Sequence, residues 1–237
     1  MAERLFLHIG PHKTGTTAFQ KVLDQNDTQL LDAGFKVVRD IEAVCGADLT
    51  FGQSTNCYGL AHQIIRSDLI TPMRMARRDM KPSPDEAIAS LKGFNVWARS
   101  QPAPNLILSS EAFSFLRTPA ERALIDVMVE GLDIVPVAVK RDPVSWLRSW
   151  SGQLQKMKLT PPIGDLGDTV FDLAETSWLV DFDAVTAFWR PDGTVIGYEA
   201  ALERHESIIP ALAELMGLPS GLIGVDRWEN VGAGVGQ

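Results

Sequence analysis

Residues 4–17 read RLFLHIGPHKTGTT. The first six are mostly apolar and are followed by Gly10, a pattern typical of a buried strand. The next eight contain two glycines, one lysine and three threonines. Apolar residues at helical spacing then extend from position 17 to position 31, where Gly34 follows. The stretch therefore predicts a strand, a glycine-containing loop and a helix in succession.

A loop between a strand and a helix N-terminus is suited to bind an anion. The first N–H groups of a helix have no partner within the helix, and the helix dipole favours negative charge there. Gly10 and Gly15 let the backbone approach an oxyanion closely, and the hydroxyls of Thr16 and Thr17 add donors. The alternative is an ordinary turn with a solvated lysine, which this composition directly after a buried strand disfavours.

The position of the lysine in this loop bears on the kind of anion. Gly10 and Gly15 have the spacing of the nucleoside-triphosphate loop G-x-x-x-x-G-K-[ST]. Thr16, however, occupies the lysine position of that motif, and the lysine of this chain, Lys13, lies inside the loop. The pattern therefore disfavours Mg·ATP as the ligand.

Strands and helices alternate along the rest of the chain. Further strands are predicted at residues 35–38, 105–109, 134–139 and 194–198, and further helices at 60–66, from 84 onward, and at 119–129, 143–157, 181–189 and 200–216. This order implies a parallel sheet with helices on both faces. We predict a single domain of the α/β class, a three-layer α/β/α fold like that of P-loop nucleoside-triphosphate hydrolases. Residues 45–84 are irregular and indicate a variable insertion, and the glycine-rich residues 232–237 indicate a flexible tail.

Three polar segments follow predicted strands, at residues 10–17, 109–111 and 140–149. Ligands of open parallel sheets bind beyond the carboxyl ends of the strands. We therefore expect these three segments to converge on one site.

The third segment predicts a second anion site. Asp142 suits a helix N-cap and Pro143 the first helical position. Ser149 comes eight residues after Arg141, about two turns into the helix. Because the guanidinium fork matches a phosphate, Arg141 and Ser149 can contact one phosphate. The alternative is that Arg141 pairs with a carboxylate and Ser149 is simply helical.

These motifs carry a family resemblance. The segment Lys13-Thr14-Gly15-Thr16-Thr17 resembles the 5′-phosphosulfate-binding loop of the sulfotransferases, and GPHKTGTT is especially similar to the bacterial and heparan-type members. The spacing from Arg141 to Ser149 is similar to the 3′-phosphate site of that family. The resemblance implies a sulfuryl donor, 3′-phosphoadenosine 5′-phosphosulfate (PAPS), with Lys13 acting at the leaving oxygen. The implied cofactor-binding residues are Gly10, His12, Lys13, Thr14, Gly15, Thr16, Thr17, Arg141, Ser149 and Arg227.

Glu111, just beyond the predicted strand 105–109, is the candidate general base. Removing the proton of an attacking hydroxyl calls for a positioned base. The resemblance supports this role, since several carbohydrate- and protein-modifying sulfotransferases use a glutamate and the small-molecule enzymes use a histidine. The alternative is a glutamate that merely begins a helix, in which case His12 is the reserve candidate. We expect His8 to be buried or paired, and His62 and His205 to lie on the surface.

Composition excludes several partners. Lys and Arg number 22 and Asp and Glu 30, so the net charge is −8, which disfavours nucleic acid and anionic membranes as ligands. No apolar run reaches the length of a transmembrane helix, and the N-terminus lacks the features of a signal peptide. Cys45 and Cys57 fit neither a metal site nor a disulfide framework. We therefore expect a cytoplasmic protein that requires no metal.

The C-terminus departs from the family pattern. Many sulfotransferases end in a basic, glycine-containing loop over the 3′-phosphate, whereas residues 227–232 contain one arginine, Arg227, and no following lysine.

Two other functions stay open: an ATP-dependent small-molecule kinase of P-loop fold, and a non-catalytic module that binds a nucleotide phosphate. The acceptor is expected to be a small molecule or a carbohydrate, and residues 45–84 are expected to shape the pocket that binds it.

Overall fold

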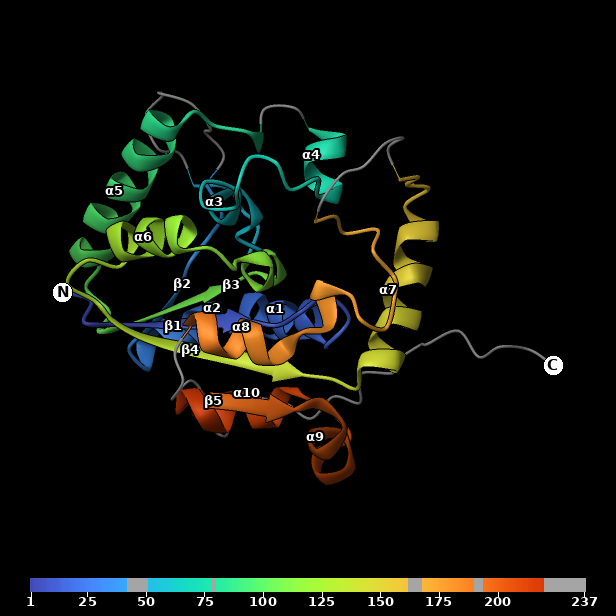
Figure 1. Cartoon of the computed structure of the whole chain (residues 1–237). Helices are drawn as coiled ribbons and strands as arrows, with labels where there is room; N and C mark the ends of the chain where they lie inside the picture. Colours follow the sequence, from blue (N-terminus) through green and yellow to red (C-terminus); the bar gives the residue numbers. More distant parts are fainter. Residues whose placement is uncertain (42–50, 78–79, 162–167, 190–193, 220–237) are drawn as a thin grey trace.

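The computed structural model describes residues 1–41, 51–77, 80–161, 168–189 and 194–219 (Figure 1). The strands are β1 (Arg4–Ile9), β2 (Phe35–Val37), β3 (Asn105–Ser109), β4 (Asp133–Lys140) and β5 (Thr194–Gly197). The helices are α1 (Thr16–Gln25), α2 (Asp27–Asp32), α3 (Tyr58–His62), α4 (Pro72–Ala76), α5 (Pro84–Ser100), α6 (Pro119–Met128), α7 (Pro143–Lys156), α8 (Phe182–Trp189), α9 (Tyr198–His205) and α10 (Ile209–Met216), with the 3-10 helices η2 (Glu111–Phe115) and η3 (Trp178–Val180).

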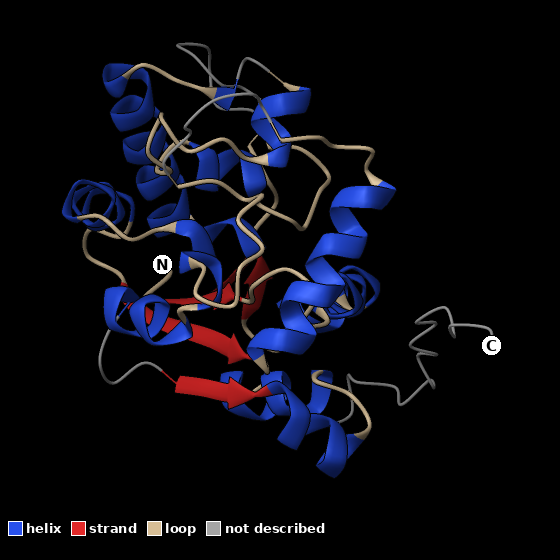
Figure 2. Cartoon of the chain, turned by 45° about the vertical axis from the view of Figure 1, so that its right-hand side comes forward, coloured by secondary structure: helices blue, strands red, loops and turns tan. Residues whose placement is uncertain are grey.

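The strands form one parallel sheet in the order β2-β3-β1-β4-β5 (Figure 2). Strand β1 is central, with His8 opposite Ser109 of β3 and Ile9 opposite Ala138 of β4. The carboxyl ends of β1, β3 and β4 therefore lie side by side. The predicted α/β fold with a central parallel sheet is confirmed.

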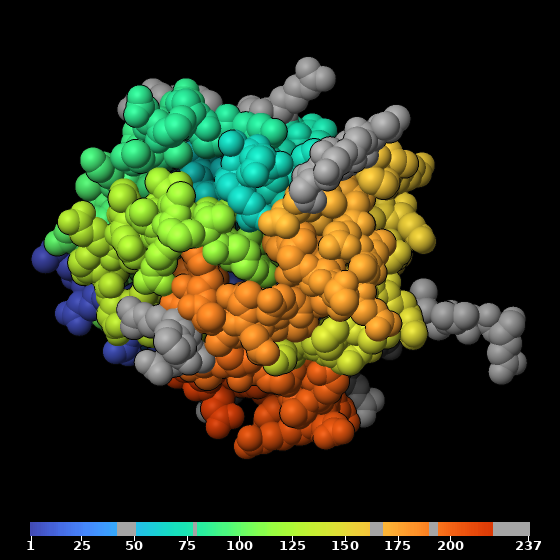
Figure 3. Space-filling model, viewed as in Figure 1, coloured from blue at the N-terminus to red at the C-terminus, as the bar shows by residue number. Residues whose placement is uncertain are grey.

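Helices cover both faces of the sheet, because side chains of a strand alternate between its two sides. Leu5, Leu7 and Ile9 of β1 belong to a core with α3 and α5 to α8, whereas Phe6 belongs to a second core with α1, α2, α9 and α10. In the space-filling view, residues 168–189 (orange) occupy the middle of one face (Figure 3), where α8 lies in front of the sheet in Figure 1. The three layers of the predicted fold are thus present.

Two predicted helices are each divided into two. The predicted helix at 17–31 is interrupted at Asn26, between α1 and α2. The predicted helix at 200–216 is interrupted after α9, where Glu206 adopts a left-handed φ of 57°. Pro210 opens α10, and a proline inside a continuous helix would remove a backbone donor and clash with the preceding turn. The prediction of one long helix is therefore wrong.

His62 is buried, with 2% of its surface exposed, so its predicted surface position is wrong. Its Nδ1 lies 2.6 Å from the main-chain oxygen of Tyr58 and must donate, because a carbonyl oxygen only accepts. Its Nε2 then accepts from the hydroxyl of Thr71, 2.8 Å away. A neutral imidazole satisfies both bonds. Burial accordingly lowers the pKa of His62 from 6.5 to about 4.

Acidification should therefore destabilise the protein through His62. The unfolded imidazole binds a proton below its pKa of 6.5, whereas the folded one does so only near pH 4. The contribution of His62 to the free energy of unfolding is thus fully present above pH 6.5 and is lost as the pH falls. By about pH 5 the loss amounts to about 2 kcal/mol. In urea unfolding, the free energy of unfolding of the wild type should fall as the pH is lowered to about 5. In His62→Gln that fall should be smaller by about the same 2 kcal/mol. Thr71→Val, which keeps the imidazole, should retain the loss; equal losses in His62→Gln and wild type would contradict the argument.

Within the residues that the structure describes, no helix combines the length and the apolar character needed to cross a bilayer.

Candidate functional site

The candidate site lies where the segments after β1, β3 and β4 meet. Gly10 begins the loop after β1, and its backbone passes close to three polar atoms. A Cβ at Gly10 would come within 2.8 Å of Thr16 Oγ1 and within 2.9 Å of both Thr14 Oγ1 and His8 Nε2. Any larger residue would therefore displace the loop. The close approach explains why glycine is found here.

The loop ends at Gly15, the N-cap of α1, with a left-handed φ of 85°. Lys13 is also left-handed, with a φ of 67°. A Cβ at Gly15 would come within 2.6 Å of Ile208 Cγ2, at the start of α10, so this position needs glycine for space as well as for conformation. The first turn of α1 follows directly, and its free N–H groups make this an anion-binding geometry.

The three threonines of the loop differ in their exposure. Thr14 is buried and donates from Oγ1 to the main-chain oxygen of Pro11, 2.7 Å away. Thr16 is also buried, and its Oγ1 has no hydrogen bond among the described residues. Thr17 is exposed in the first turn of α1. The loop therefore offers the hydroxyl of Thr17 to a ligand and keeps those of Thr14 and Thr16 inside.

Arg141 joins the segment after β4 to this loop. Its Nη1 donates to the main-chain oxygen of Lys13, and its guanidinium carbon lies 4.8 Å from the ring centre of Tyr198. Asp142 caps α7 by accepting from Ser145 N at 2.8 Å, as predicted. The two predicted anion-binding groups, the Lys13 loop and Arg141, therefore face the same place.

Helix α7 lies along the loop. Trp146 Nε1 donates to the main-chain oxygen of His12 at 2.5 Å, and Lys13 Nζ lies 3.5 Å from Gln153 Oε1. Ser149 is half-buried between these contacts, and its side chain has no hydrogen bond within the described part of the chain. Burial and the positive charges of Lys156 and Arg141 lower the pKa of Lys13.

His12 lies between aromatic rings. Its ring centre is 4.6 Å from that of Trp150, nearly parallel to it, and 5.6 Å from that of Phe115. Burial lowers the pKa of His12, and the charge of Glu111 acts in the opposite direction. His12 therefore packs against η2, the segment that begins at Glu111, although the two segments follow different strands.

Glu111 is 7% exposed and begins η2. Its Oε2 accepts from Asn56 Nδ2 at 2.8 Å, and Asn56 Oδ1 accepts in turn from Ser110 Oγ at 2.9 Å. The carboxylate is thus held by one oxygen, and Oε1 has no hydrogen bond within the described ranges. Asn56 was not predicted from the sequence, because nothing near position 56 marks a partner 55 residues away.

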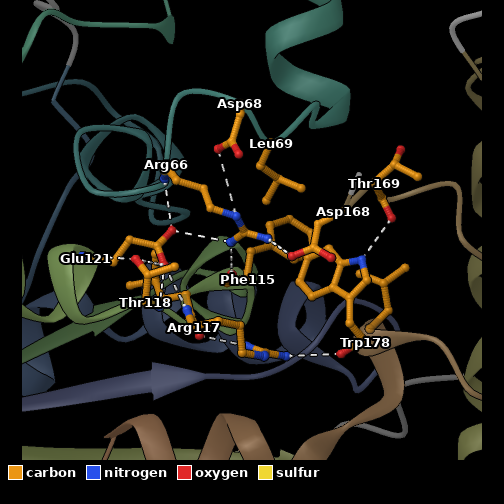
Figure 4. A network of polar contacts seen from close by, with 12 residues as sticks. Arg66, Asp68, Leu69, Phe115, Arg117, Thr118, Glu121, Asp168, Thr169 and Trp178 are labelled. Carbon is orange, nitrogen blue, oxygen red and sulfur yellow. Dashed lines mark hydrogen bonds and ion pairs between the residues drawn. The ribbon is translucent and has the colours of Figure 1, made fainter. Parts of the chain in front are cut away.

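Two arginines fix the segment that begins at Glu111 (Figure 4). Arg66 Nη1 donates to the main-chain oxygen of Phe115 at 3.1 Å, and Arg117 Nη1 donates to that of Ser114 at 2.5 Å. Glu121, which is 1% exposed, accepts from the main-chain N–H of Arg66 at 2.9 Å, and Asp168 accepts from Nη2 of Arg66 at 2.6 Å. This network connects residues 51–77 to α6 and to the segment before α8. It restrains η2, and therefore the backbone of Glu111.

A second set of buried contacts joins β1 and α1, the elements on either side of the loop, to β3. His8 is fully buried, as predicted, and its Nδ1 lies 2.9 Å from Ser109 Oγ, which also accepts from Gln20 Nε2 at 3.1 Å. Burial lowers the pKa of His8 to about 3, so the imidazole is neutral. Ser109 belongs to the predicted polar segment 109–111, whereas Gln20 was not identified from the sequence. Their contacts hold β1 and α1 against β3, the strand after which Glu111 follows.

The structure thus brings Arg141 and η2, which begins at Glu111, against the loop. Ser149 lies on α7 between Trp146 and Gln153, which both contact the loop. Arg227 lies outside the described residues, as does Cys45. The described residues contain no group of three His, Cys, Asp or Glu side chains that could hold a metal ion.

Comparison with known proteins identifies a shared fold. No protein-family model matches the chain, and no curated protein sequence matches it either. A sulfotransferase from Alicyclobacillus acidocaldarius is similar over 92% of this chain and 83% of its own, with a TM-score of 0.50 and 11% sequence identity. The sulfotransferase domain from the curacin biosynthetic pathway matches 92% of this chain and 75% of its own, with a TM-score of 0.48 and 12% identity. By its fold, this chain is therefore similar to the sulfotransferases.

Proposed function

We propose that the protein is a sulfotransferase that takes the sulfuryl group from PAPS. The observation that carries the proposal is the contact between Arg141 and the main-chain oxygen of Lys13. It puts two cations beside an anion-binding loop, where no carboxylate pairs with either of them among the described residues. A donor with a 5′-phosphosulfate and a 3′-phosphate supplies anions for both groups.

In the proposed complex, the loop and α1 bind the 5′-phosphosulfate, and Arg141 and Ser149 bind the 3′-phosphate. The sulfur–oxygen bond to the 5′-phosphate breaks as a new one forms to the acceptor hydroxyl. Lys13 offsets the charge on the phosphate oxygen that keeps the electron pair. Glu111 takes the proton of the acceptor hydroxyl. Positioning and charge stabilisation supply the catalysis, as in phosphoryl transfer.

The acceptor side is proposed to include residues of the predicted insertion, 45–84. Asn56 belongs to this segment and holds Glu111, which supports that location. The acceptor itself is proposed to be a small molecule or a carbohydrate with a hydroxyl or an amine.

Two other functions are less well supported. A P-loop kinase would place a lysine after Gly15, where this chain has Thr16, and would need an acidic Mg²⁺ partner at a strand end. A non-catalytic nucleotide-binding module would have no use for a buried carboxylate held beside the loop, as Glu111 is.

Calorimetry with 3′-phosphoadenosine 5′-phosphate (PAP) tests the donor. PAP should bind at least about tenfold more tightly than ATP·Mg²⁺ or 5′-AMP, since only PAP carries a 3′-phosphate for Arg141. Arg141→Gln should weaken PAP binding by about tenfold or more and leave 5′-AMP binding nearly unchanged. Tighter binding of ATP·Mg²⁺ than of PAP would overturn the proposal in favour of the kinase.

A further inference from the structure

Helix α7 is basic in an acidic protein. Residues 143–164 contain no Asp or Glu, although the whole chain has 30 acidic residues and a net charge of −8. Arg148 and Lys156 lie on the helix, Arg141 precedes it and Lys158 follows it. The positive charge is therefore a local property of this segment.

One side of α7 faces the loop. At 100° per residue, Ser149, Gln153 and Lys156 fall on one side of the helix. The contact between Lys13 Nζ and Gln153 Oε1 brings this side against the loop. Lys156 follows Gln153 by three residues and is its neighbour on the helix surface. The positive charge of Lys156 lowers the pKa of Lys13, which agrees with this placement.

Lys13 thus has two further positive charges near it, those of Arg141 and Lys156. None of the three forms an ion pair in the portions of the chain that the structure describes, whereas several other basic residues do: Arg4, Arg39, Arg66, Arg122 and Lys140. Like charges at close range repel one another. A bound anion would offset that repulsion.

Lys156 occupies a different end of this cluster from Arg141. Arg141 precedes α7, whereas Lys156 is the last residue of the helix, about 20 Å along its axis from Pro143 at about 1.5 Å per residue. Lys13 Nζ meets the helix one turn before Lys156, at Gln153. On the proposed function, Arg141 holds the donor's 3′-phosphate and Lys13 faces the transferred group. Lys156 therefore lies beyond the transferred group, on the acceptor side.

We infer that Lys156, together with Gln153, binds an anionic group of the acceptor, of the carboxylate class. The inference rests on the proposed function and adds the chemical class of the acceptor. An ammonium and an amide donor can share the two oxygens of one carboxylate.

Two matched pairs of probes test this site by calorimetry on the PAP-saturated protein. They are 4-nitrophenyl β-D-glucuronide against the corresponding glucoside, and 4-hydroxybenzoate against 4-hydroxybenzyl alcohol. In at least one pair, the probe with the carboxylate should bind about tenfold or more tightly than its neutral counterpart. Lys156→Gln should abolish that preference. Arg148→Gln removes the same charge from an exposed position in the N-terminal half of α7, and this variant should preserve the carboxylate preference.

The titrations distinguish the failure of this inference from the failure of the proposed function. Equal affinities within both pairs, or a preference that survives Lys156→Gln, would overturn the inference while PAP binding stands. A loss of PAP affinity in Lys156→Gln would also overturn it, because Lys156 would then belong to the donor site. The same titrations without PAP complete the test. A carboxylate preference that depends on Lys156, in a protein that does not bind PAP, would keep the anion site and reject the sulfotransferase.

Discussion

Lys13→Met should lower kcat/KM for the PAP-dependent release of 4-nitrophenol from 4-nitrophenyl sulfate by about a hundredfold to a thousandfold. This reaction is the proposed transfer run backwards, so it needs no knowledge of the natural acceptor. Both directions share one transition state, in which charge is divided between the phosphate oxygen and the acceptor oxygen. Lys13 is the loop's cation, and methionine keeps its length but not its charge. Absorbance of released nitrophenolate measures the effect.

The control for Lys13→Met removes an unrelated charge. Lys92 is exposed on α5, and Lys92→Met should leave turnover unchanged. Both variants should keep the wild-type unfolding midpoint, because Lys13 makes one weak side-chain hydrogen bond, at 3.5 Å. Wild-type turnover in a folded Lys13→Met protein would remove Lys13 from the catalytic machinery.

Glu111→Gln should lower transfer of labelled sulfate from PAPS to an aliphatic or sugar hydroxyl by about a hundredfold to ten-thousandfold. The amide cannot take the proton of the attacking hydroxyl, but its oxygen still accepts from Asn56, so the local structure is kept. The same variant should lose less than about tenfold in the reverse assay, because nitrophenolate departs without needing a proton from an acid. The two assays together therefore separate proton transfer from all other effects.

A Glu111→Gln protein with wild-type transfer to an alkyl hydroxyl would show that Glu111 is not the base. His12, the reserve candidate, then becomes the group to test, since it belongs to the loop and packs against Phe115 of η2. On the assignment preferred here, His12→Asn should cost less than Glu111→Gln in the alkyl assay, because His12 only supports the loop by packing on Trp150. Equal losses in both variants would indicate that the two side chains act together.

The sequence predicted the parts of the site whose signals are local. The loop at 10–17, the Asp142 cap and the carboxylate after β3 are each encoded within a few residues. The parallel order of the strands then follows from the alternation of strands and helices. That β1 lies between β3 and β4, which brings these local signals to neighbouring strand ends, was not predicted and comes from the structure.

Contacts between distant segments could not be predicted in this way. Lys13 meets Gln153 across 140 residues, and Asn56 meets Glu111 across 55. Asn56 lies in the irregular segment, where spacing gives no register. His62 was misplaced for the same reason, since its burial depends on α3 packing against η2 rather than on its own neighbours. The divided helices were missed because apolar spacing continued through Asn26 and through Pro210.

The hydrogen bond from Asn56 to Glu111 limits how this protein can be redesigned. A natural way to change its selectivity would be to graft another enzyme's segment in place of residues 51–77, where much of the acceptor surface is proposed to lie. Such a chimera would also remove the amide that orients the proposed base, Glu111, and the arginine, Arg66, that anchors η2. Grafts should therefore keep these two side chains and vary the residues between them.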